Sequence, residues 1–461
     1  MQNNTFTFCI TWVIMFDDNY HLSLKSGETM SLQKVGYINR IIDSMINEYL
    51  ELFGAISIEG PKWCGKTWTA LNHANSVSYI MDPADNYNNK TLAGLNPSFI
   101  LPGEKPRLID EWQEIPGIWD AVRFDIDQNP GRGKYILTGS VLPPQGSYMH
   151  SGTGRIATIQ MRPMTMYESG DSIGKISLQA IFNNEKIEPV MANLDLIKLI
   201  NITIRGGWPE TLTQPIENSG RVAIEYINTI VKNELFHEDQ SKRNHQKLRR
   251  TIRSLARNNA TTASIETLAA DVDSSEKITQ NDGDITVSRH SVVDYIKDLM
   301  KIFIIEEIPA WNPNIRSTVI MRQAPKRIFT DPSLALAALD ADKSRMLQDL
   351  NTFGFMFENL CLRDLTVYSL NYGGKIFHYR DNSDLEVDAI IEMPNGTWGA
   401  FEIKLGENKV DSAANTLIRM KEKMVTAGSE PPACLAVITG GGIARLRDDG
   451  VYVIPINSLK H

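Results

Sequence analysis

The run Gly60-Pro61-Lys62-Trp63-Cys64-Gly65-Lys66-Thr67 is the feature that most restricts how this chain can fold. Residues 55–59 before it read as a short buried strand, and residues 67–73 read as the opening of a helix. A glycine turn between a strand and a helix directs several backbone N–H groups and the positive end of the helix dipole to one point. Such a point suits the phosphates of a nucleotide. Lys66 would face the β- and γ-phosphates, and the Thr67 hydroxyl would be a ligand of Mg²⁺. All eight residues are therefore predicted to form a site for ATP.

Length, charge and cysteine content narrow the class of protein. At 461 residues the chain exceeds what one hydrophobic core usually serves, so several domains are expected. The net charge of −8 gives no general attraction to nucleic acid, so any such contact needs a local basic patch. The four cysteines lie far apart, which is typical of the reducing cytoplasm and not of a zinc site or a disulfide framework. The apolar segment 5–16 is too short to span a bilayer, and no membrane partner is expected.

Polar side chains end two strands downstream of the glycine turn. Residues 76–82, 107–111 and 134–140 read as strands, and residues 118–128 read as a helix. Asp110 at a strand end is placed to hold Mg²⁺ through its waters, and its neighbour Glu111 to orient or deprotonate an attacking water. A solvated turn is the alternative for this pair. Thr138 either senses the γ-phosphate or satisfies a loop.

Several short motifs occur in a characteristic order. They are Tyr37-Ile38-Asn39-Arg40-Ile41-Ile42-Asp43, the glycine run at 60–67, Leu108-Ile109-Asp110-Glu111-Trp112-Gln113, Leu137-Thr138-Gly139-Ser140, Gly154-Arg155-Ile156-Ala157 and Arg205-Gly206-Gly207-Trp208-Pro209-Glu210. This set resembles an uncharacterised bacterial and archaeal family of AAA+-type ATPases that carry a C-terminal domain of unknown function. The resemblance covers residues 33–445 and implies a five-stranded parallel sheet in the ATPase domain.

The same resemblance makes Arg155 and Arg162 candidate arginine fingers or γ-phosphate sensors. An arginine supplied by a neighbouring subunit would stabilise charge in the transition state, so this role requires a homo-oligomer. A surface arginine or a structural ion pair is the alternative for each. Trp63 and Trp68 flank the phosphate loop, where packing is favoured over stacking on an adenine.

The middle of the chain, residues 195–345, is mostly helical by periodicity and has two features that bear on function. The stretch 241–260 holds no acid and seven cations, which are Lys242, Arg243, Lys247, Arg249, Arg250, Arg253 and Arg257. These cations either contact phosphates or form a solvated helix face for subunit contact. Residues 263–270 and 287–296 read as two helices followed by a hairpin, as in a winged helix. Arg289, His290 and Lys297 would read DNA there, unless the module only supports packing.

A second group of charged residues lies near the end of the chain. Glu358 falls on an amphipathic helix, Asp388 on a strand, and Glu402 and Lys404 on one face of the next strand. Metal-dependent cleavage of a phosphodiester uses such acids to hold Mg²⁺, here Asp388 and Glu402, and a lysine to position the nucleophile. The pattern resembles the PD-(D/E)XK superfamily of restriction-endonuclease-like folds. Glu358 matches its helical acid, Asp388 its strand aspartate, and Glu402-Ile403-Lys404 its E-x-K. The alternative is a strand face whose Glu402 and Lys404 merely pair.

These patterns together predict an α/β protein of four parts. They are an N-terminal extension over 1–32, a P-loop AAA+-type parallel-sheet ATPase domain over 33–194, a helical and winged-helix-like domain over 195–345, and a restriction-endonuclease-like α/β domain over 346–461. The predicted function is Mg²⁺-dependent ATP binding and hydrolysis in the cytoplasm, coupled to binding or cleavage of DNA or RNA by the C-terminal domain. The alternative is a nucleotide-controlled binding or scaffold protein whose nuclease-like fold does not cleave.

Overall fold

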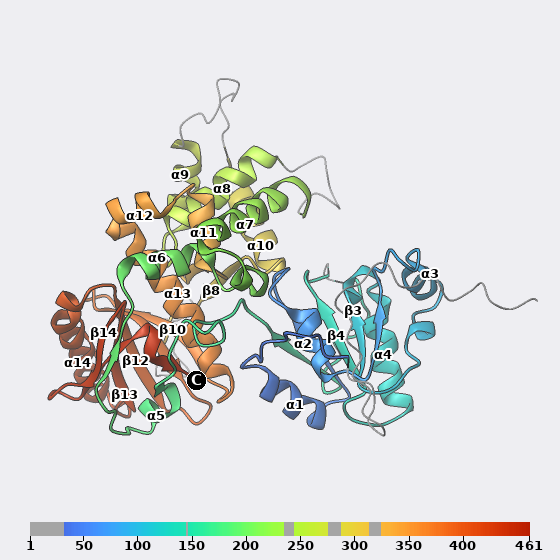
Figure 1. Ribbon diagram of the computed structural model, residues 1–461, viewed down its shortest axis with the longest axis horizontal. Coiled ribbons are helices and arrows are strands. Elements are labelled where there is room, and N and C mark those ends of the chain that lie inside the picture. Colours follow the sequence, from blue (N-terminus) through green and yellow to red (C-terminus); the bar gives the residue numbers. More distant parts are fainter. Residues whose placement is uncertain (1–31, 144–145, 235–243, 275–286, 313–323) are drawn as a thin grey trace, which may run out of the picture.

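The computed structural model describes residues 32–143, 146–234, 244–274, 287–312 and 324–461. The chain forms an N-terminal lobe, a middle lobe and a C-terminal lobe (Figure 1). Almost all of the predicted extension over 1–32 lies outside the described residues. No helix in the described ranges combines the length and the apolar character that crossing a bilayer requires.

The N-terminal lobe is built on a parallel sheet of five strands in the order β2-β3-β4-β1-β5. The strands are β1 (Ala55–Glu59), β2 (Ser76–Tyr79), β3 (Arg107–Asp110), β4 (Tyr135–Gly139) and β5 (Ile156–Gln160), and the helices are α1 (Asp43–Leu52), α2 (Lys66–His73), α3 (Asn88–Leu95) and α4 (Gly117–Gln128). Apolar side chains pack on both faces of the sheet. This confirms the predicted parallel sheet. Because parallel strands end at the same edge, the residues after β1, β3 and β4 are brought together.

The segment between the N-terminal and middle lobes differs from the prediction. We assigned all of residues 33–194 to the ATPase domain, but β6 (Ile176–Ser177) pairs with β16 (Leu459–Lys460), and β7 (Val190–Ala192) pairs with β14 (Gly442–Leu446) in the C-terminal lobe. The helix α5 (Leu178–Phe182) lies beside the same lobe (Figure 1). Strand β7 satisfies backbone groups that the edge strand β14 would otherwise leave unpaired.

The middle lobe is helical with one hairpin. Its elements are α6 (Leu196–Arg205), α7 (Ile216–Thr229), α8 (His245–Arg257), α9 (Ile265–Ser274), α10 (Arg289–Lys301), β8 (Ile305–Ile308), β9 (Lys326–Phe329), α11 (Pro332–Ala338) and α12 (Lys343–Gln348). Strands β8 and β9 pair antiparallel, and Thr261 forms an isolated bridge with Arg327 of β9. The Ser288 side chain caps α10 by accepting from the N–H of Ser291. Two helices and an antiparallel pair of strands therefore follow one another in the chain, and their assignment to a winged helix stays a prediction.

The C-terminal lobe contains a mixed sheet of seven strands in the order β10-β11-β12-β13-β15-β14-β7. The strands of this sheet not yet given are β10 (Lys375–Arg380), β11 (Glu386–Glu392), β12 (Trp398–Lys404), β13 (Cys434–Thr439) and β15 (Val451–Pro455). The lobe also contains the helices α13 (Leu350–Leu370) and α14 (Val410–Thr426). The apolar side of α14 packs in one cluster with β11, β12 and β13, while α13 packs in another that continues into the middle lobe. The long helix α13 thus connects the C-terminal sheet with the rest of the molecule (Figure 1).

Candidate nucleotide site and C-terminal acid cluster

Glycine is required at two positions of the phosphate loop. A side chain at Gly60 would place its Cβ 2.1 Å from the carbonyl oxygen of Met161, which follows β5. Gly65 has a φ of 101°, in the left-handed region, and the next residue, Lys66, begins α2. The N-terminal end of α2 therefore faces the loop directly. The Lys66 side chain curls into the loop, where its ammonium donates to the Pro61 carbonyl at 2.8 Å.

The predicted carboxylates lie beside this loop. Asp110 Oδ1 accepts hydrogen bonds from the hydroxyls of Thr67 (2.8 Å) and Thr138 (2.7 Å), and burial raises the pKa of Asp110. Glu111 has left-handed backbone angles, and its N–H donates to Thr138 Oγ1 at 3.2 Å. Its carboxylate accepts from Ser140 Oγ at 3.0 Å and from the Gln113 amide. The hydroxyl and carboxylate oxygens of Thr67 and Asp110 are the hard ligands that Mg²⁺ prefers, so this site fits the predicted ion.

Arg40 supports the loop from behind, a role that the sequence did not predict. Its guanidinium donates to the carbonyl oxygens of Cys64 and Arg162, each at 2.8 Å, and pairs with Glu168 at 3.0 Å. Both charged side chains are buried. The sequence pattern that could have indicated this role is an arginine directly before the apolar Ile41, within a motif shared with the resembled family.

The run 205–210 joins the middle lobe to the phosphate loop. A Cβ on Gly207 would lie 2.1 Å from the carbonyl oxygen of Met164, so the two backbones touch. Trp208 stacks on Tyr226 with ring centroids 5.0 Å apart, and the Tyr226 hydroxyl donates to the Lys62 carbonyl at 3.2 Å. The loop is thus held by residues outside its own domain. Trp63 and Trp68 are about half exposed, and their role stays a prediction.

The two candidate arginine fingers occupy opposite ends of the sheet. Arg155 precedes β5, at the end far from the phosphate loop, and its half-exposed side chain pairs with Asp127 at 2.9 Å. It therefore does not face the loop of its own chain, and action in a neighbouring subunit stays a prediction. Arg162 follows β5 on the loop side, but its guanidinium pairs with Glu306 of β8 at 2.7 Å.

The predicted C-terminal residues converge in the structure. Lys404 Nζ lies 2.9 Å from Asp388 Oδ2 and 2.5 Å from Glu402 Oε2. Glu358, on α13, joins them through a residue that we did not predict. Lys326 Nζ lies 2.5 Å from Glu358 Oε1 and 4.0 Å from Asp388 Oδ1. We call these three acids and two lysines the acid cluster.

Burial and the charges of the two lysines shift the pKa values of the carboxylates in the acid cluster. Burial raises the pKa of Glu358 to about 7 and that of Glu402 to about 8. Burial also opposes ionisation of Asp388, but the charges of Lys404 and Lys326 outweigh it and lower its pKa. Within the described ranges, no three Asp, Glu, His or Cys side chains are placed to share a metal ion. This arrangement does not fit a divalent cation, because ammonium groups lie between the carboxylates, and the metal role of Asp388 and Glu402 stays a prediction.

The basic residues of the middle lobe are largely engaged with other groups. Arg253 pairs with Asp340 (3.1 Å), Arg257 with Asp271 (3.2 Å) and Arg289 with Glu266 (2.6 Å), His290 lies 3.6 Å from Asp294, and Arg249 donates to Asn228 (2.8 Å). Arg250 is buried, and Lys242 and Arg243 lie outside the described residues. These helices therefore offer less accessible positive charge than the sequence suggests, and DNA reading by Arg289, His290 and Lys297 stays a prediction.

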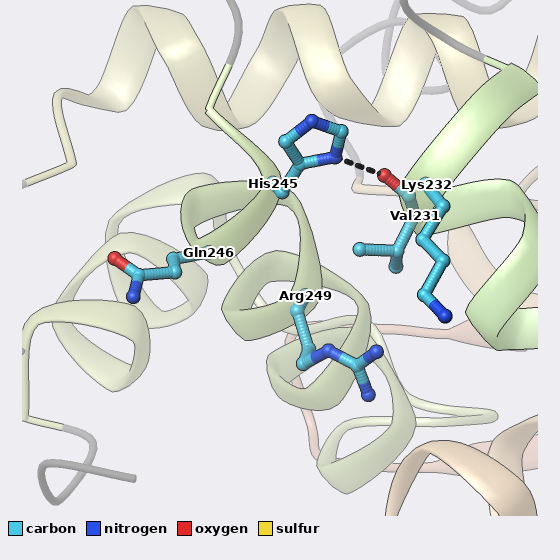
Figure 2. A pocket seen from close by; sticks show the side chains of 5 residues that line it. All are labelled: Val231, Lys232, His245, Gln246 and Arg249. Atoms are coloured by element: carbon cyan, nitrogen blue, oxygen red, sulfur yellow. Dashed lines mark hydrogen bonds between the residues drawn. The ribbon is translucent and has the colours of Figure 1, made fainter. Parts of the chain in front are cut away.

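A pocket of about 440 Å³ lies where α8 begins, beside the residues that follow α7. Figure 2 shows its lining residues Val231, Lys232, His245, Gln246 and Arg249, with the His245 ring bonded to the Val231 carbonyl. Arg249 is one of the seven cations of the predicted basic stretch, and His245 and Gln246 lie in the same stretch. The pocket is separate from the phosphate loop and from the acid cluster, since the residues that line it belong to neither.

Family models match three segments of the chain. A model of an AAA domain matches residues 53–169, a domain of unknown function (DUF8612) matches residues 197–345, and another domain of unknown function (DUF4143) matches residues 353–459. The first of these segments contains the phosphate loop, Asp110 and Glu111. The N-terminal lobe is therefore similar to AAA domains and has the parallel-sheet, P-loop ATPase-like fold that was predicted.

Similar proteins are known from bacteria and archaea. Two uncharacterized proteins, from Mycobacterium tuberculosis and Mycobacterium bovis, are each 22% identical over 352 residues, which is 76% of this chain and 70% of theirs. Among solved structures, a Walker-type ATPase of Pyrococcus abyssi is 13% identical, with a TM-score of 0.39 over 67% of this chain and 97% of that chain. AMPPCP-bound DnaA from Aquifex aeolicus is 16% identical, with a TM-score of 0.25 over 58% of this chain and 89% of that chain.

Proposed function

We propose that this chain binds ATP together with Mg²⁺ and hydrolyses it at the phosphate loop. The observation that carries the proposal is the 2.8 Å hydrogen bond between Thr67 and Asp110, which places a hydroxyl and a carboxylate side by side at the start of α2. These two oxygens would hold Mg²⁺, which supplies charge neutralisation on the phosphates when it is bound.

Each neighbouring residue has a separate task in this proposal. The N–H groups at the start of α2 and the Lys66 ammonium bind the phosphates. Glu111 orients the attacking water and accepts its proton, while Ser140 and Gln113 fix the Glu111 carboxylate. Thr138 bonds both Asp110 and the N–H of Glu111, which supports a positioning role for Thr138 over direct sensing of the γ-phosphate.

A comparison of two glutamates in one turn tests this assignment. Glu111→Gln should still bind ATP but release phosphate at least about 100-fold more slowly, because the amide cannot accept the proton. Glu114→Gln, three residues on and paired with Lys90 on the surface, is the matched control and should keep the wild-type rate. Equal phosphate release by Glu111→Gln and wild type would show that Glu111 is not the base.

For the C-terminal lobe we propose a nuclease-like fold whose action on DNA or RNA depends on the nucleotide state, with the middle lobe as a winged-helix-like connector. A second candidate is nucleotide-controlled binding without cleavage. One observation favours it: each of the three carboxylates of the acid cluster is paired with one of the two lysines. Incubating labelled single- and double-stranded DNA and RNA with ATP and Mg²⁺ or Mn²⁺ separates the two. Cleavage that Asp388→Asn abolishes supports the first, and binding without cleavage supports the second.

A further inference from the structure

The phosphate loop contains a residue in a backbone conformation that its own side chain does not hold in place. Trp63 has a φ of 68°, in the left-handed region that a bulky residue rarely adopts, and its side chain is 55% exposed. Such a conformation persists only where the surrounding structure fixes the backbone. The two carbonyl groups on either side of Trp63, those of Lys62 and Cys64, each accept a hydrogen bond from a side chain outside the loop.

The donor to the Lys62 carbonyl comes from the middle lobe and is itself held in place. Tyr226 lies in the last turn of α7, and its hydroxyl donates to the Lys62 carbonyl at 3.2 Å. Its ring stacks on the buried Trp208, whose indole N–H donates to Ser333 Oγ at 3.0 Å. The stacking fixes the position of the ring, so the hydroxyl is presented to the loop from a rigid support.

The donor to the Cys64 carbonyl is the buried guanidinium of Arg40. Its Nη1 contacts the Cys64 carbonyl and its Nη2 the Arg162 carbonyl, each at 2.8 Å, while Glu168 balances the charge. A planar guanidinium reaches both carbonyls at once, which the single ammonium of a lysine does not. Arg40 thus fixes the loop relative to the segment that follows β5.

These two contacts determine the direction of two N–H groups. In a planar trans peptide, the C=O of one residue and the N–H of the next point in opposite directions. Because the carbonyls of Lys62 and Cys64 are held on one side, the N–H groups of Trp63 and Gly65 face the other way. Within the described ranges, neither of these N–H groups bonds a backbone carbonyl. In a phosphate loop, such N–H groups surround the α- and β-phosphates of the nucleotide.

We propose that Tyr226 and Arg40 are positioning residues of the nucleotide site, which set its affinity by directing the N–H groups of Trp63 and Gly65 at the phosphates. This inference rests on the proposed binding of ATP at the loop. Because Tyr226 belongs to the middle lobe, nucleotide affinity depends on the contact between that lobe and the N-terminal lobe. Such coupling is reciprocal, so bound nucleotide strengthens the same contact by the same factor.

Equilibrium binding of labelled ATP and ADP to the full-length protein tests the role of Tyr226. Tyr226→Phe removes one hydroxyl and keeps the ring that stacks on Trp208. It should raise the Kd of both nucleotides and the KM for ATP about three- to tenfold, since both carry the α- and β-phosphates. The kcat should stay within about twofold of wild type, because the groups around Glu111 are unchanged. Tyr49→Phe, which removes a hydroxyl from α1, is the matched control and should bind like wild type. Wild-type affinity in Tyr226→Phe, or a lower kcat at unchanged KM, would overturn the proposal.

A second variant tests the other donor. Arg40→Lys keeps a positive charge beside Glu168 but does not reach both carbonyls, so it should weaken binding of ATP and ADP at least about tenfold at unchanged kcat. Wild-type affinity in this variant would contradict the role of Arg40. If loss of cooperative unfolding shows that Arg40→Lys does not fold, the affinity of Tyr226→Phe decides the proposal.

Amide hydrogen exchange tests the reciprocal effect. In wild type, a non-hydrolysable ATP analogue should slow exchange in α7 and in residues 205–211, and the slowing should be smaller in Tyr226→Phe at saturating analogue. Equal exchange with and without the analogue in wild type would contradict the coupling. A wild-type protein that binds no ATP would contradict the proposed function itself, whereas equal ATP binding by wild type and Tyr226→Phe contradicts only this inference.

Discussion

The nucleotide site contains a partly buried aspartate, Asp110, and the acid cluster contains a buried one, Asp388, and the two aspartates have opposite partners. The hydrogen bonds to the Asp110 side chain come from the hydroxyls of Thr67 and Thr138. Asp388 accepts from the ammonium of Lys404 and the N–H of Ile403, with Lys326 at 4.0 Å. Accordingly, burial raises the pKa of Asp110, whereas the lysines lower that of Asp388 against the same effect of burial.

The difference shows how one residue type can serve binding or docking. A carboxylate held by neutral hydroxyls has no compensating charge beside it, so an incoming cation would complete the site. A carboxylate held by ammonium groups is already compensated, and separating the partners leaves buried charges alone. The first arrangement favours a ligand, and the second favours contact between lobes.

The largest expected effect is on the free energy of unfolding, when each of the two aspartates is replaced by asparagine. Asp388→Asn should lower the free energy of unfolding by about 3 kcal/mol, because the buried Lys326 and the partly buried Lys404 lose a shared negative partner. Asp110→Asn should change it by less than about 1 kcal/mol, because the amide oxygen still accepts from both hydroxyls. Urea denaturation of the two variants gives both numbers. Equal losses of stability would mean that the lysines do not distinguish the sites.

A smaller but functionally severe effect is expected at the lysine of the phosphate loop. Lys66→Ala removes the ammonium that faces the phosphates and should weaken ATP binding about 100-fold, as expected for the loss of charge-assisted hydrogen bonds. Equilibrium binding of labelled ATP measures this change. Lys90→Ala, on the surface of the same lobe, is the control and should bind like wild type. If Lys66→Ala bound ATP as tightly as wild type, the phosphate loop would not be the site of nucleotide binding.

The sequence predicts these sites as far as local patterns define them. The phosphate loop follows from the spacing of Gly60, Gly65 and Lys66, because strand, turn and helix are adjacent in the chain. Asp110 could be placed because parallel strands end at one edge of a sheet, and the described geometry agrees. The convergence of Asp388 and Glu402 follows from the antiparallel pairing of β11 and β12.

Contacts between lobes could not be predicted from one sequence. Lys326 lies 32 residues before Glu358 and 62 before Asp388, at the start of a strand in a different lobe. The sequence around it, Ala324-Pro325-Lys326-Arg327, reads only as a polar strand end. The pairing of β7 with β14 could not be predicted for the same reason, since the partner of an edge strand is decided by tertiary structure. Neither contact leaves a periodic pattern.

The pH dependence of stability sharpens the comparison further. Glu402 has its pKa raised from the ordinary 4.5 to about 8, so between these values the folded state binds more protons than the unfolded state. Stability from this group is therefore complete below about pH 4.5 and falls as pH rises towards 8. Glu402→Gln should reduce the loss of unfolding free energy between pH 5 and 8 by about 1–2 kcal/mol. Urea denaturation across this range, with the exposed Glu422→Gln as control, measures it. An unchanged slope would mean that Glu402 ionises normally in the folded protein.

The smallest effect on stability is expected at Arg155, the candidate arginine finger at the far end of the sheet. Its partner Asp127 is on the surface and its own side chain is 48% exposed, so Arg155→Ala should leave the urea denaturation curve unchanged. A role in a neighbouring subunit would still appear in the kinetics. The wild-type rate of ATP hydrolysis per subunit should rise with protein concentration, and mixing Arg155→Ala with Lys66→Ala should restore part of the activity, since each variant supplies what the other lacks. A concentration-independent rate in a monomeric protein would reduce the Arg155–Asp127 pair to a surface contact, and the nucleotide site would then be completed within a single chain.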